Sequence, residues 1–522
     1  MATKRFSFNQ TPQTRPLPGQ TQNNAGGFSF TVDKWKRLER FLILGSDKGT
    51  YYVKECELTF DNAKSVLECI KEDPQRVLNT VSDISEGGRA PKNDQALFVL
   101  AILTAKAPHL LKNFDITRVA RIGTHIFDLC GMVEKQGLRR WGRSLRSFIG
   151  KWYMQDPDNL IYQVIKYRQR NGWTHTDVMR LSHPKPTTET QEMIFQWVTK
   201  GETQNARYAG SKIHEFDMLQ RSTSESEVID IITRSHLPWE CVPTNFLKSA
   251  NVWKALLPNL PLTALVRNLG RLSAIGAFGG DSELEETVYS RLTSEEYIRK
   301  SRLHPLSILL ALKTYNSGQG DKGKLTWGPH KSICNALDKA FYLAFRTITP
   351  TEKRILLALD VSSSMRGNMI AGMNIDAREG SAAMAMITKR TELEAKIMAF
   401  SHQFVPFPIE DDDKLTEVIW KADSIGFGST DCALPMIYAL KNRMLMDAFI
   451  VYTDSETWAG IIHPVQALKE YRDWSGINSK LVVVGMTSTE FTIGDPNDLG
   501  CMDVVGFDTS APAVINDFIR SE

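Results

Sequence analysis

The sequence predicts a multidomain protein, with an all-α part followed by an α/β part that has a doubly wound, mostly parallel sheet. The chain has 522 residues, and at roughly 100–200 residues per domain this length allows about two to four domains. Residues 31–348 show helical spacing of apolar residues and few candidate strands. Residues 349–522 alternate short apolar runs with helical stretches, which is the pattern of a parallel sheet with helices on both faces.

The composition excludes several classes of protein. Apolar residues make up 42% and charged residues 24%, which is typical of globular proteins and excludes disorder over most of the length. No run approaches the ~18 apolar residues of a membrane span, and the basic N-terminus lacks the apolar stretch of a secretory signal. The seven cysteines form no C-x-x-C pair, so we expect neither a disulfide framework nor a zinc site, but reduced cysteines in a cytoplasmic protein.

The first 350 residues divide into a polar start and a helical series. Residues 1–30 have no apolar period, so we expect an extended or flexible N-terminal arm. Residues 94–106 and 138–153 are two examples of predicted helices. In the second, Trp141 and Trp152 belong to an apolar stripe at spacings of three and four, which favours core positions. No clean period emerges, so a globular bundle and stacked HEAT-like pairs both remain open.

The last part of the chain supplies the sheet. Strands are expected at residues 354–360, 395–400, 447–454, 480–485 and 502–507, with helices between them at 380–390, 433–443 and 464–474. In such a sheet, ligands bind at the carboxyl ends of the strands.

Charge is distributed unevenly along the chain. Residues 351–522 hold 15 basic and 25 acidic side chains, whereas residues 1–350 hold 48 basic and 35 acidic ones. The excess of basic residues is concentrated at 101–190, with 15 basic and 7 acidic side chains. This asymmetry favours a part that binds a polyanion joined to an acidic part.

Oxygen-bearing side chains gather at the predicted strand ends. The set comprises Asp360, Ser362, Ser364, Thr430 and Asp454. Two carboxylates with three hydroxyls suit a divalent cation, and the preference of Mg²⁺ for hard oxygen ligands favours that ion. The lack of His and Cys argues against zinc. The pattern resembles the metal-ion-dependent adhesion site (MIDAS) of von Willebrand factor A (vWA) domains, whose metal keeps a position open for an acidic side chain of a partner. The alternative is that the hydroxyls merely cap a helix.

Several longer motifs carry a resemblance to one family. Residues 166–175, 180–183, 261–270, 302–305, 311–315, 430–436 and, more weakly, 503–506 resemble the Ro 60 kDa autoantigen family, from about residue 30 to the C-terminus. The resemblance implies a TROVE ring of HEAT-like repeats over residues 31–348 and an A domain over 349–522. It implies binding of small noncoding Y or Y-like RNA on a basic outer surface and of single-stranded 3′ ends of misfolded RNAs through the ring. It also implies a possible scaffold for an exoribonuclease.

The residues that match the family's RNA surface are Lys166, Arg170 and His183. On a helix, Lys166 and Arg170 share one face and can bridge neighbouring phosphates. The proline after His183 is expected to end a helix, and the imidazole can contact phosphate or stack on a base. Further phosphate candidates are Arg139, Arg140, Arg143, Lys151 and Arg267.

The leading hypothesis is therefore a monomeric, non-catalytic RNA-binding protein with no membrane association. A second hypothesis is a metal-dependent adhesion module that binds an acidic partner through the A domain; it leaves the basic first 350 residues unexplained. A third is a ribonuclease, which two carboxylates diluted by three hydroxyls support poorly.

Overall fold

The computed structural model forms two compact units. It describes residues 11–23, 25–31, 34–44, 64–87, 90, 93–135, 137, 140–201, 206–279, 283–301, 303–320, 324–367, 375–401, 403–426, 428–454, 457–486, 491–495, 498, 500–505 and 511–520. The α/β unit comprises Met1–Glu68, Arg89–Pro91 and Ala344–Glu522, and the helical unit comprises Cys69–Gly88 and Lys92–Leu343. The division at 343/344 lies close to the predicted one. Residues 34–44 and 64–68 group with the α/β unit instead, where α1 (Lys34–Leu44) contacts β11 (Cys501–Val505).

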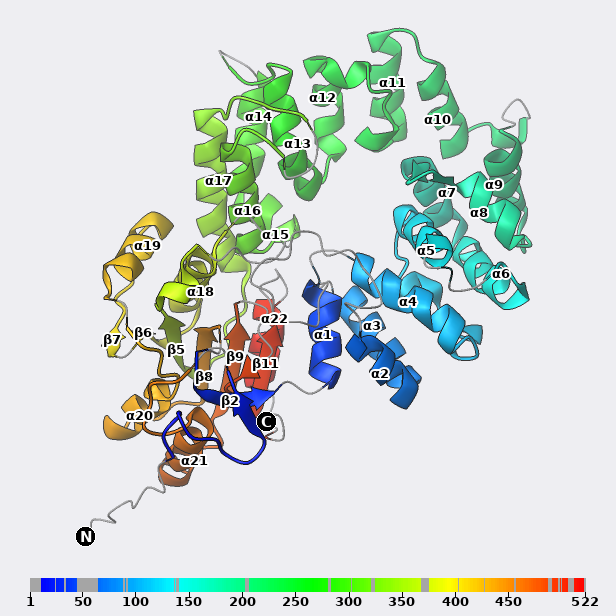
Figure 1. Ribbon diagram of the computed structural model, residues 1–522. Helices are drawn as coiled ribbons and strands as arrows, with labels where there is room; N and C mark the ends of the chain where they lie inside the picture. Colours follow the sequence, from blue (N-terminus) through cyan, green and yellow to red (C-terminus); the bar gives the residue numbers. More distant parts are fainter. Residues whose placement is uncertain are drawn as a thin grey trace. The chain divides into compact units, whose positions relative to one another are not determined.

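The helical unit is a series of short helices packed on their neighbours along the chain (Figure 1). Its helices are α3 (Pro74–Glu86), α4 (Asp94–Lys106), α5 (Gly123–Lys135), α6 (Arg143–Gly150), α7 (Pro157–Lys166), α8 (His175–Ser182), α9 (Glu189–Lys200), α10 (Lys212–Arg221), α11 (Glu225–Ser235), α12 (Ala250–Leu256), α13 (Leu262–Ala274), α14 (Glu283–Leu292), α15 (Glu295–Ser301), α16 (Pro305–Asn316) and α17 (Lys331–Leu343); α2 (Lys64–Glu72) precedes them. The all-α prediction for this part is confirmed. Within the described residues, no helix is long and apolar enough to cross a bilayer.

The predicted helix at 138–153 is shorter than expected. It starts at Arg143 and gives way to a 3-10 turn at Lys151–Met154. Trp152 is fully buried, as predicted, and its indole N–H donates to the Ala120 carbonyl at 2.7 Å. Trp141 lies before the helix and is half-buried, with its indole N–H bonded to Glu134. Its place in the apolar stripe was therefore wrong, because the helix begins two residues after it.

A tight hairpin interrupts the segment that was expected to continue as a helix through residue 170. Strands β3 (Gln169–Arg170) and β4 (Trp173–Thr174) pair antiparallel. Asn171 and Gly172 between them have φ of 51° and 81°, the conformation that a two-residue Asn-Gly hairpin turn requires. Thr174 then caps α8 reciprocally with Asp177, which satisfies backbone donors at the helix start.

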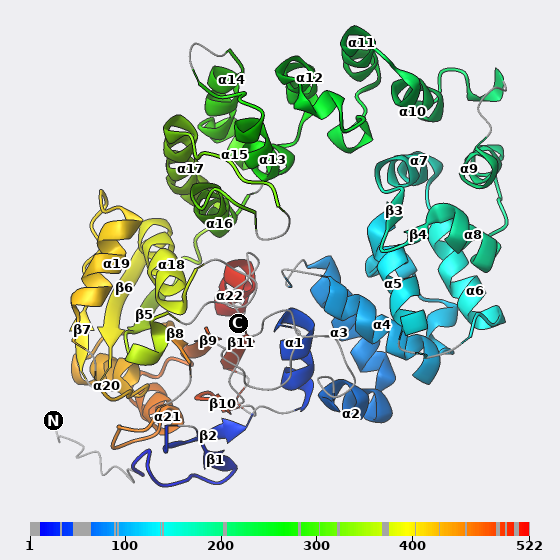
Figure 2. The same ribbon diagram turned by 45° about the horizontal axis from the view of Figure 1, so that its top comes forward.

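The α/β unit is built on a six-stranded sheet in the order β11-β9-β8-β5-β6-β7 (Figure 2). The strands are β5 (Arg354–Asp360), β6 (Glu394–Phe400), β7 (Phe404–Pro406), β8 (Ala448–Thr453), β9 (Lys480–Gly485) and β11. All neighbours are parallel except β7, which runs antiparallel to β6. The predicted doubly wound sheet is confirmed, with the short edge strand β7 as an addition.

Helices cover both faces of this sheet. Helix α18 (Ala377–Thr391) contacts β5 and β6, and it packs on α19 (Leu415–Ser424). On the other face, α20 (Leu434–Lys441) and α21 (Pro464–Ser475) pack over alternate strand residues such as Leu356 and Phe449. The last helix, α22 (Ala511–Arg520), contacts β11. Because both faces are buried, the strands are continuous apolar runs, which is why their positions were predictable.

The N-terminal segment is docked on the α/β unit. Strands β1 (Gln20–Gln22), β2 (Phe28–Thr31) and β10 (Phe491–Thr492) form a small antiparallel sheet. The segment is extended, as predicted, but residues 11–23 and 25–30 do not form a flexible arm. Two of their polar side chains, those of Gln13 and Asn23, form hydrogen bonds to the loop that follows β8, such as that from Asn23 Nδ2 to the Thr457 carbonyl at 2.7 Å.

The start of α5 gives a first prediction. A Cβ on Gly123 would stand 2.8 Å from Tyr167 Cβ, whereas one on Gly131, in the same helix, would meet nothing closer than 3.5 Å. We expect Gly123→Ala to lower the free energy of unfolding by roughly 1–3 kcal/mol through overpacking. Gly131→Ala, the control, should raise it by up to about 1 kcal/mol through helix propensity. Denaturation in urea checks both, and equal effects of the two changes would contradict the expectation.

Candidate functional site

The carboxyl ends of β5 and β8 bring two aspartates to one point of the sheet. Asp360 is the last residue of β5, and Asp454 directly follows β8. The two strands are parallel neighbours. The chain continues from β5 to β6 on one side and from β8 to β9 on the other, so this is the switch point at which doubly wound sheets bind ligands. Both side chains are buried, with 1% of Asp360 and none of Asp454 exposed.

Hydrogen bonds fix the orientation of Asp360. Its Oδ1 accepts from the Ser362 backbone N–H, and its Oδ2 accepts from the Thr453 hydroxyl, both at 2.8 Å. Ser362 is buried beside it. Ser364 lies in the 3-10 turn Ser363–Met365, and its side chain falls outside the described residues.

Thr430 is tied to the loop that carries Asp454. Its carbonyl accepts from the backbone N–H groups of Trp458 and Ala459 at 3.1 and 3.2 Å. Its side chain is buried. Thr430 lies before α20, which starts at Leu434, close to the predicted start at residue 433, and Asp431 accepts a hydrogen bond from the Ala433 N–H in the preceding turn.

The electrostatics of this site fit a divalent cation. Burial, followed by the negative charge of Asp454, raises the pKa of Asp360 well above its usual range. Two adjacent buried carboxylates oppose each other's ionisation, and a bound cation relieves that repulsion. No cluster of three or more His, Cys, Asp and Glu occurs in the part of the chain that the structure describes. The available donors are therefore carboxylates and hydroxyls, the ligands that Mg²⁺ accepts.

Lys166 and Arg170 do not share a helix face. Lys166 ends α7, where its ammonium lies 3.3 Å from Glu240 and donates to the Tyr162 hydroxyl at 3.0 Å. Burial opposes its charge, but the bond to Tyr162 and the charge of Glu240 outweigh burial and raise the pKa of Lys166. Arg170 lies on the hairpin, 3.1 Å from the Asp128 carboxylate. The predicted i, i+4 pair is wrong, because the Asn-Gly turn redirects the chain.

His183 caps the carboxyl end of α8. It adopts the left-handed conformation, with φ of 51°, and its side chain is exposed. The helix ends before Pro184, as predicted. Gly150, at the end of α6, lies against the Ser182 carbonyl and Pro184, so the ends of α6 and α8 meet next to His183.

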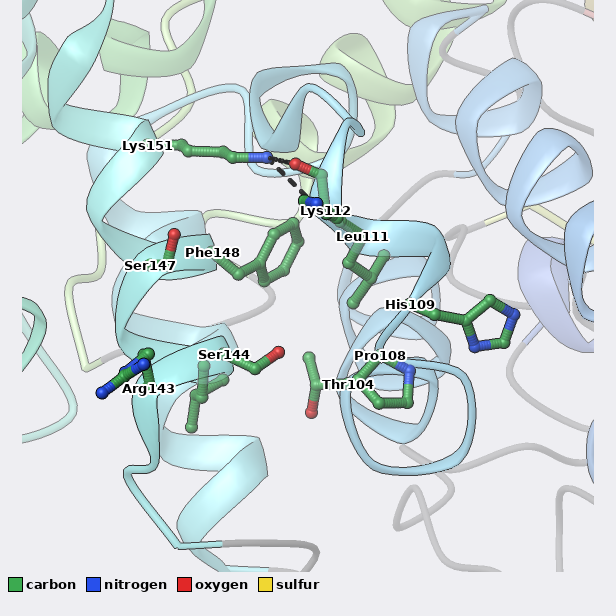
Figure 3. A pocket seen from close by; sticks show the side chains of 11 residues that line it. Thr104, Pro108, His109, Leu111, Lys112, Arg143, Ser144, Ser147, Phe148 and Lys151 are labelled. Atoms are coloured by element: carbon green, nitrogen blue, oxygen red, sulfur yellow. Dashed lines mark hydrogen bonds between the residues drawn. The ribbon is translucent and has the colours of Figure 1, made fainter.

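Several of the other predicted cations lie in or next to helix α6. Arg140 precedes it and Arg143 begins it, and both are exposed. Arg143 and Lys151 border a cavity of about 470 Å³ between α6 and the end of α4 (Figure 3). The Lys151 ammonium donates to the Leu111 carbonyl at 3.2 Å and also to that of Lys112. An RNA phosphate would therefore have to compete with these two carbonyls for the ammonium. Arg267 is exposed on α13, and Arg139 lies outside the described residues.

Our sequence reasoning did not select Arg146 and Arg180. Both are exposed, on α6 and α8. Within the described part of the chain, neither forms an ion pair. Arg146 follows Arg143 by three residues and so lies on the same side of α6, a spacing that was visible in the sequence.

Comparisons with known proteins identify the family. The TROVE domain matches residues 21–234 and 231–314, and the Ro60 vWA domain matches residues 354–519. RNA-binding protein RO60 of Deinococcus radiodurans is 38% identical over 520 residues, covering 98% of this chain and 97% of that protein. The chain belongs to the Ro60 family. RNA-binding protein RO60 of Caenorhabditis elegans is 33% identical over 585 residues, covering 97% of this chain and 90% of that protein.

A solved structure supports the same assignment for the fold. The crystal structure of the Deinococcus radiodurans RO (RSR) protein is similar, with a TM-score of 0.73 and 36% identity, over 94% of this chain and 99% of that one. The predicted membership of the Ro60 family is thereby confirmed. So is the division into a helical part and a vWA domain.

The buried side chain of His175 leads to a prediction of how the stability of this Ro60 family member changes with pH. His175, the first residue of α8, is bonded to the Tyr153 hydroxyl at 2.9 Å, and burial lowers the pKa of His175 to about 3. As the pH falls, His175 is therefore protonated in the unfolded chain at a higher pH than in the folded protein. The free energy of unfolding consequently decreases as the pH falls from about 6.5 toward 3. Between pH 6.5 and 5, we expect this group to cost about 2 kcal/mol.

Replacing His175 with Phe should reduce the difference in unfolding free energy between pH 6.5 and pH 5 by that amount, as measured with urea. Phe127→Leu is the control, since Phe127 packs 4.6 Å from the His175 ring but does not titrate. His125 and His304, whose pKa values burial lowers to about 4, contribute to the slope in every variant. A His175→Phe profile parallel to that of the wild type would contradict the assignment.

Proposed function

We propose that this chain is a non-catalytic, cytoplasmic RNA-binding protein. The observation that carries this proposal is near full-length similarity to two proteins named RNA-binding protein RO60. Its ligands would be small Y or Y-like RNA on the basic surface and, as the family resemblance implies, single-stranded 3′ ends of misfolded RNAs at a central ring. In this role the protein acts in RNA quality control or as a scaffold for an exoribonuclease, and it functions as a monomer.

Exposed cations on successive elements of the helical unit support this proposal. They are Arg140, Arg143, Arg146, Arg168, Arg170, Arg180 and Lys185. They lie on or close in sequence to α6, the β3–β4 hairpin and α8, and α6 packs on α8. A duplex presents closely spaced phosphates, and each cation that neutralises one releases a counterion. Side chains of this kind position an RNA without reading its sequence.

The predicted contacts divide into two kinds. Arg143 and Arg146 have no acidic partner among the described residues, so a phosphate can pair with either guanidinium without displacing a carboxylate. Lys166 and Arg170 already face Glu240 and Asp128, so a phosphate must compete with a carboxylate. In return, these ion pairs hold the two side chains in place before RNA arrives, which reduces the entropy lost on binding.

Replacing Lys166 and Arg170 with Ala should therefore weaken RNA binding and flatten its salt dependence. Two lost phosphate contacts would make the slope of log K against log salt shallower by roughly 1.5. We expect a similar change for Arg143→Ala with Arg146→Ala. Arg234→Ala with Lys300→Ala removes exposed cations on α11 and α15 and should leave the slope unchanged.

The measurement uses a short duplex RNA with a single-stranded 3′ tail beside the same duplex with blunt ends, titrated across a salt series. Tighter binding of the tailed RNA supports recognition of 3′ ends. Equal binding of both argues for a surface that recognises duplex alone. The RNA is inspected for cleavage in Mg²⁺, because cleavage that disappears in Asp360→Ala would contradict a non-catalytic role.

The vWA domain suggests a second, compatible function, which is recruitment of a protein through a bound metal. We propose that Asp360, Ser362, Ser364, Thr430 and Asp454 hold Mg²⁺, which would supply a coordination position for a partner's carboxylate. In the loop tied to Thr430, the Trp458 and Ile461 side chains are 40% and 64% exposed. Exposed aromatic and aliphatic side chains next to a charged group are typical of protein interfaces.

Adding Mg²⁺ or Mn²⁺ should raise the thermal stability of the protein. At a concentration of 100 Kd, a bound ion contributes about 2.7 kcal/mol. Asp454→Asn should abolish this effect because one of two carboxylates is lost. Asp447→Asn, at the other end of β8 and paired with Arg354, is the control and should keep it. An unchanged response in Asp454→Asn would locate the ion elsewhere.

A further inference from the structure

The N-terminal segment reaches the loops that carry the proposed metal ligands. Gln13 is fully buried although it lies in a polar stretch near the chain start. Its backbone N–H donates to the Gly460 carbonyl at 2.9 Å, and its own carbonyl accepts from Phe28 N–H at 3.0 Å. The residue is therefore fixed between β2 and the loop after β8.

The Gln13 side chain satisfies three groups of those loops. Its Nε2 donates to Asp431 Oδ1 at 2.8 Å and to the Ile462 carbonyl at 2.9 Å, while its Oε1 accepts from the Thr457 hydroxyl. Asp431 follows Thr430 in sequence, and Thr457 comes three residues after Asp454. One amide thus joins the segment of Thr430 to the segment of Asp454.

The same turn is closed by further bonds. Thr457 Oγ1 accepts from the Cys432 N–H at 3.1 Å, and Thr430 accepts from Trp458 and Ala459. The loop packs closely on Gln13, since a Cβ on Gly460 would stand 2.1 Å from Gln13 Nε2. A Cβ on Gly27 would stand 2.1 Å from the Thr457 carbonyl, so the segment is tightly packed on the loop at a second point.

From this geometry we propose that Gln13 is a positioning residue for the metal centre. It sets the distance between the Thr430 and Asp454 segments by crosslinking Asp431 and Thr457, and it does not itself contact the metal. The inference rests on the proposed metal site. Outer hydrogen-bond partners of this kind typically change metal affinity by about 10–100-fold when replaced, because the free ligands must then be ordered by the ion.

Gln13→Met tests the proposal, because methionine keeps the length of the side chain and loses its hydrogen bonds. The matched control is Gln20→Met in the same segment. The Gln20 side chain contacts His463 Nδ1 at 3.3 Å and the Leu17 N–H, and within the described residues it has no bond to the loop at 457–460. The full-length proteins are titrated with Mn²⁺ by calorimetry. Amide hydrogen exchange is measured separately on the metal-free proteins.

We expect Gln13→Met to weaken Mn²⁺ binding at least about tenfold and to speed exchange of the Cys432, Trp458 and Ala459 amides. Gln20→Met should bind Mn²⁺ like the wild type. Unchanged binding in Gln13→Met would overturn the proposal. If the wild type binds no Mn²⁺, the proposed metal site is wrong, and the proposed role of Gln13 in metal binding is wrong as well. In that case the exchange data show separately whether Gln13 stabilises the loop after β8.

Thr457→Val provides a second route if Gln13→Met does not fold. It removes the hydroxyl that donates to Gln13 and should reproduce the loss of Mn²⁺ affinity. Where both variants fold, the double variant should bind no more weakly than the weaker single one, because the two side chains act through one network. Additive losses would mean that Thr457 and Gln13 act independently, which contradicts the crosslink.

Discussion

The parallel pairing of β5 with β8 is the constraint on which the proposed metal centre depends. It places Asp360 beside the Thr453 hydroxyl and brings Asp454 to the same edge of the sheet. Burying two carboxylates together destabilises the fold. The flanking strands, the helices on both faces of the sheet and the hydrogen bonds to Asp360 offset this destabilisation. The sheet thus fixes the position of the two carboxylates, and the loops that carry Ser362 and Thr430 add their hydroxyls beside them.

This part of the molecule was readable from the sequence for a physical reason. A buried parallel strand is a continuous apolar run, and a polar residue that ends it marks the edge of the sheet. Residues 354–360 and 480–485 were predicted at the bounds of β5 and β9. Where a strand is short and at an edge, as in β7, burial imposes no such pattern, and the strand was missed.

The remaining features depend on contacts that local spacing does not encode. Lys166 and Arg170 are four residues apart, which is consistent with a helix face, yet the turn at Asn171 and Gly172 makes a hairpin more stable. The Asn-Gly pair, which is typical of a two-residue hairpin turn, stands in the sequence, but the prediction rested on the charge spacing alone. Gln13 gave no signal at all, because a glutamine in a polar stretch reveals nothing about a partner 444 residues away.

That separation has a consequence for synthesis on the ribosome. Residues 11–31 emerge early, whereas β8 and the loop that receives Gln13 emerge only after the whole helical unit. At roughly 5–20 residues per second, the segment waits on the order of a minute for its partners. During this interval all residues of the helical unit are synthesised, so this unit can fold. The α/β unit has residues on both sides of the helical unit in the sequence. It can be completed only after β8 and the strands that follow it have been synthesised, so a product truncated before β8 would leave the N-terminal segment without a docking site.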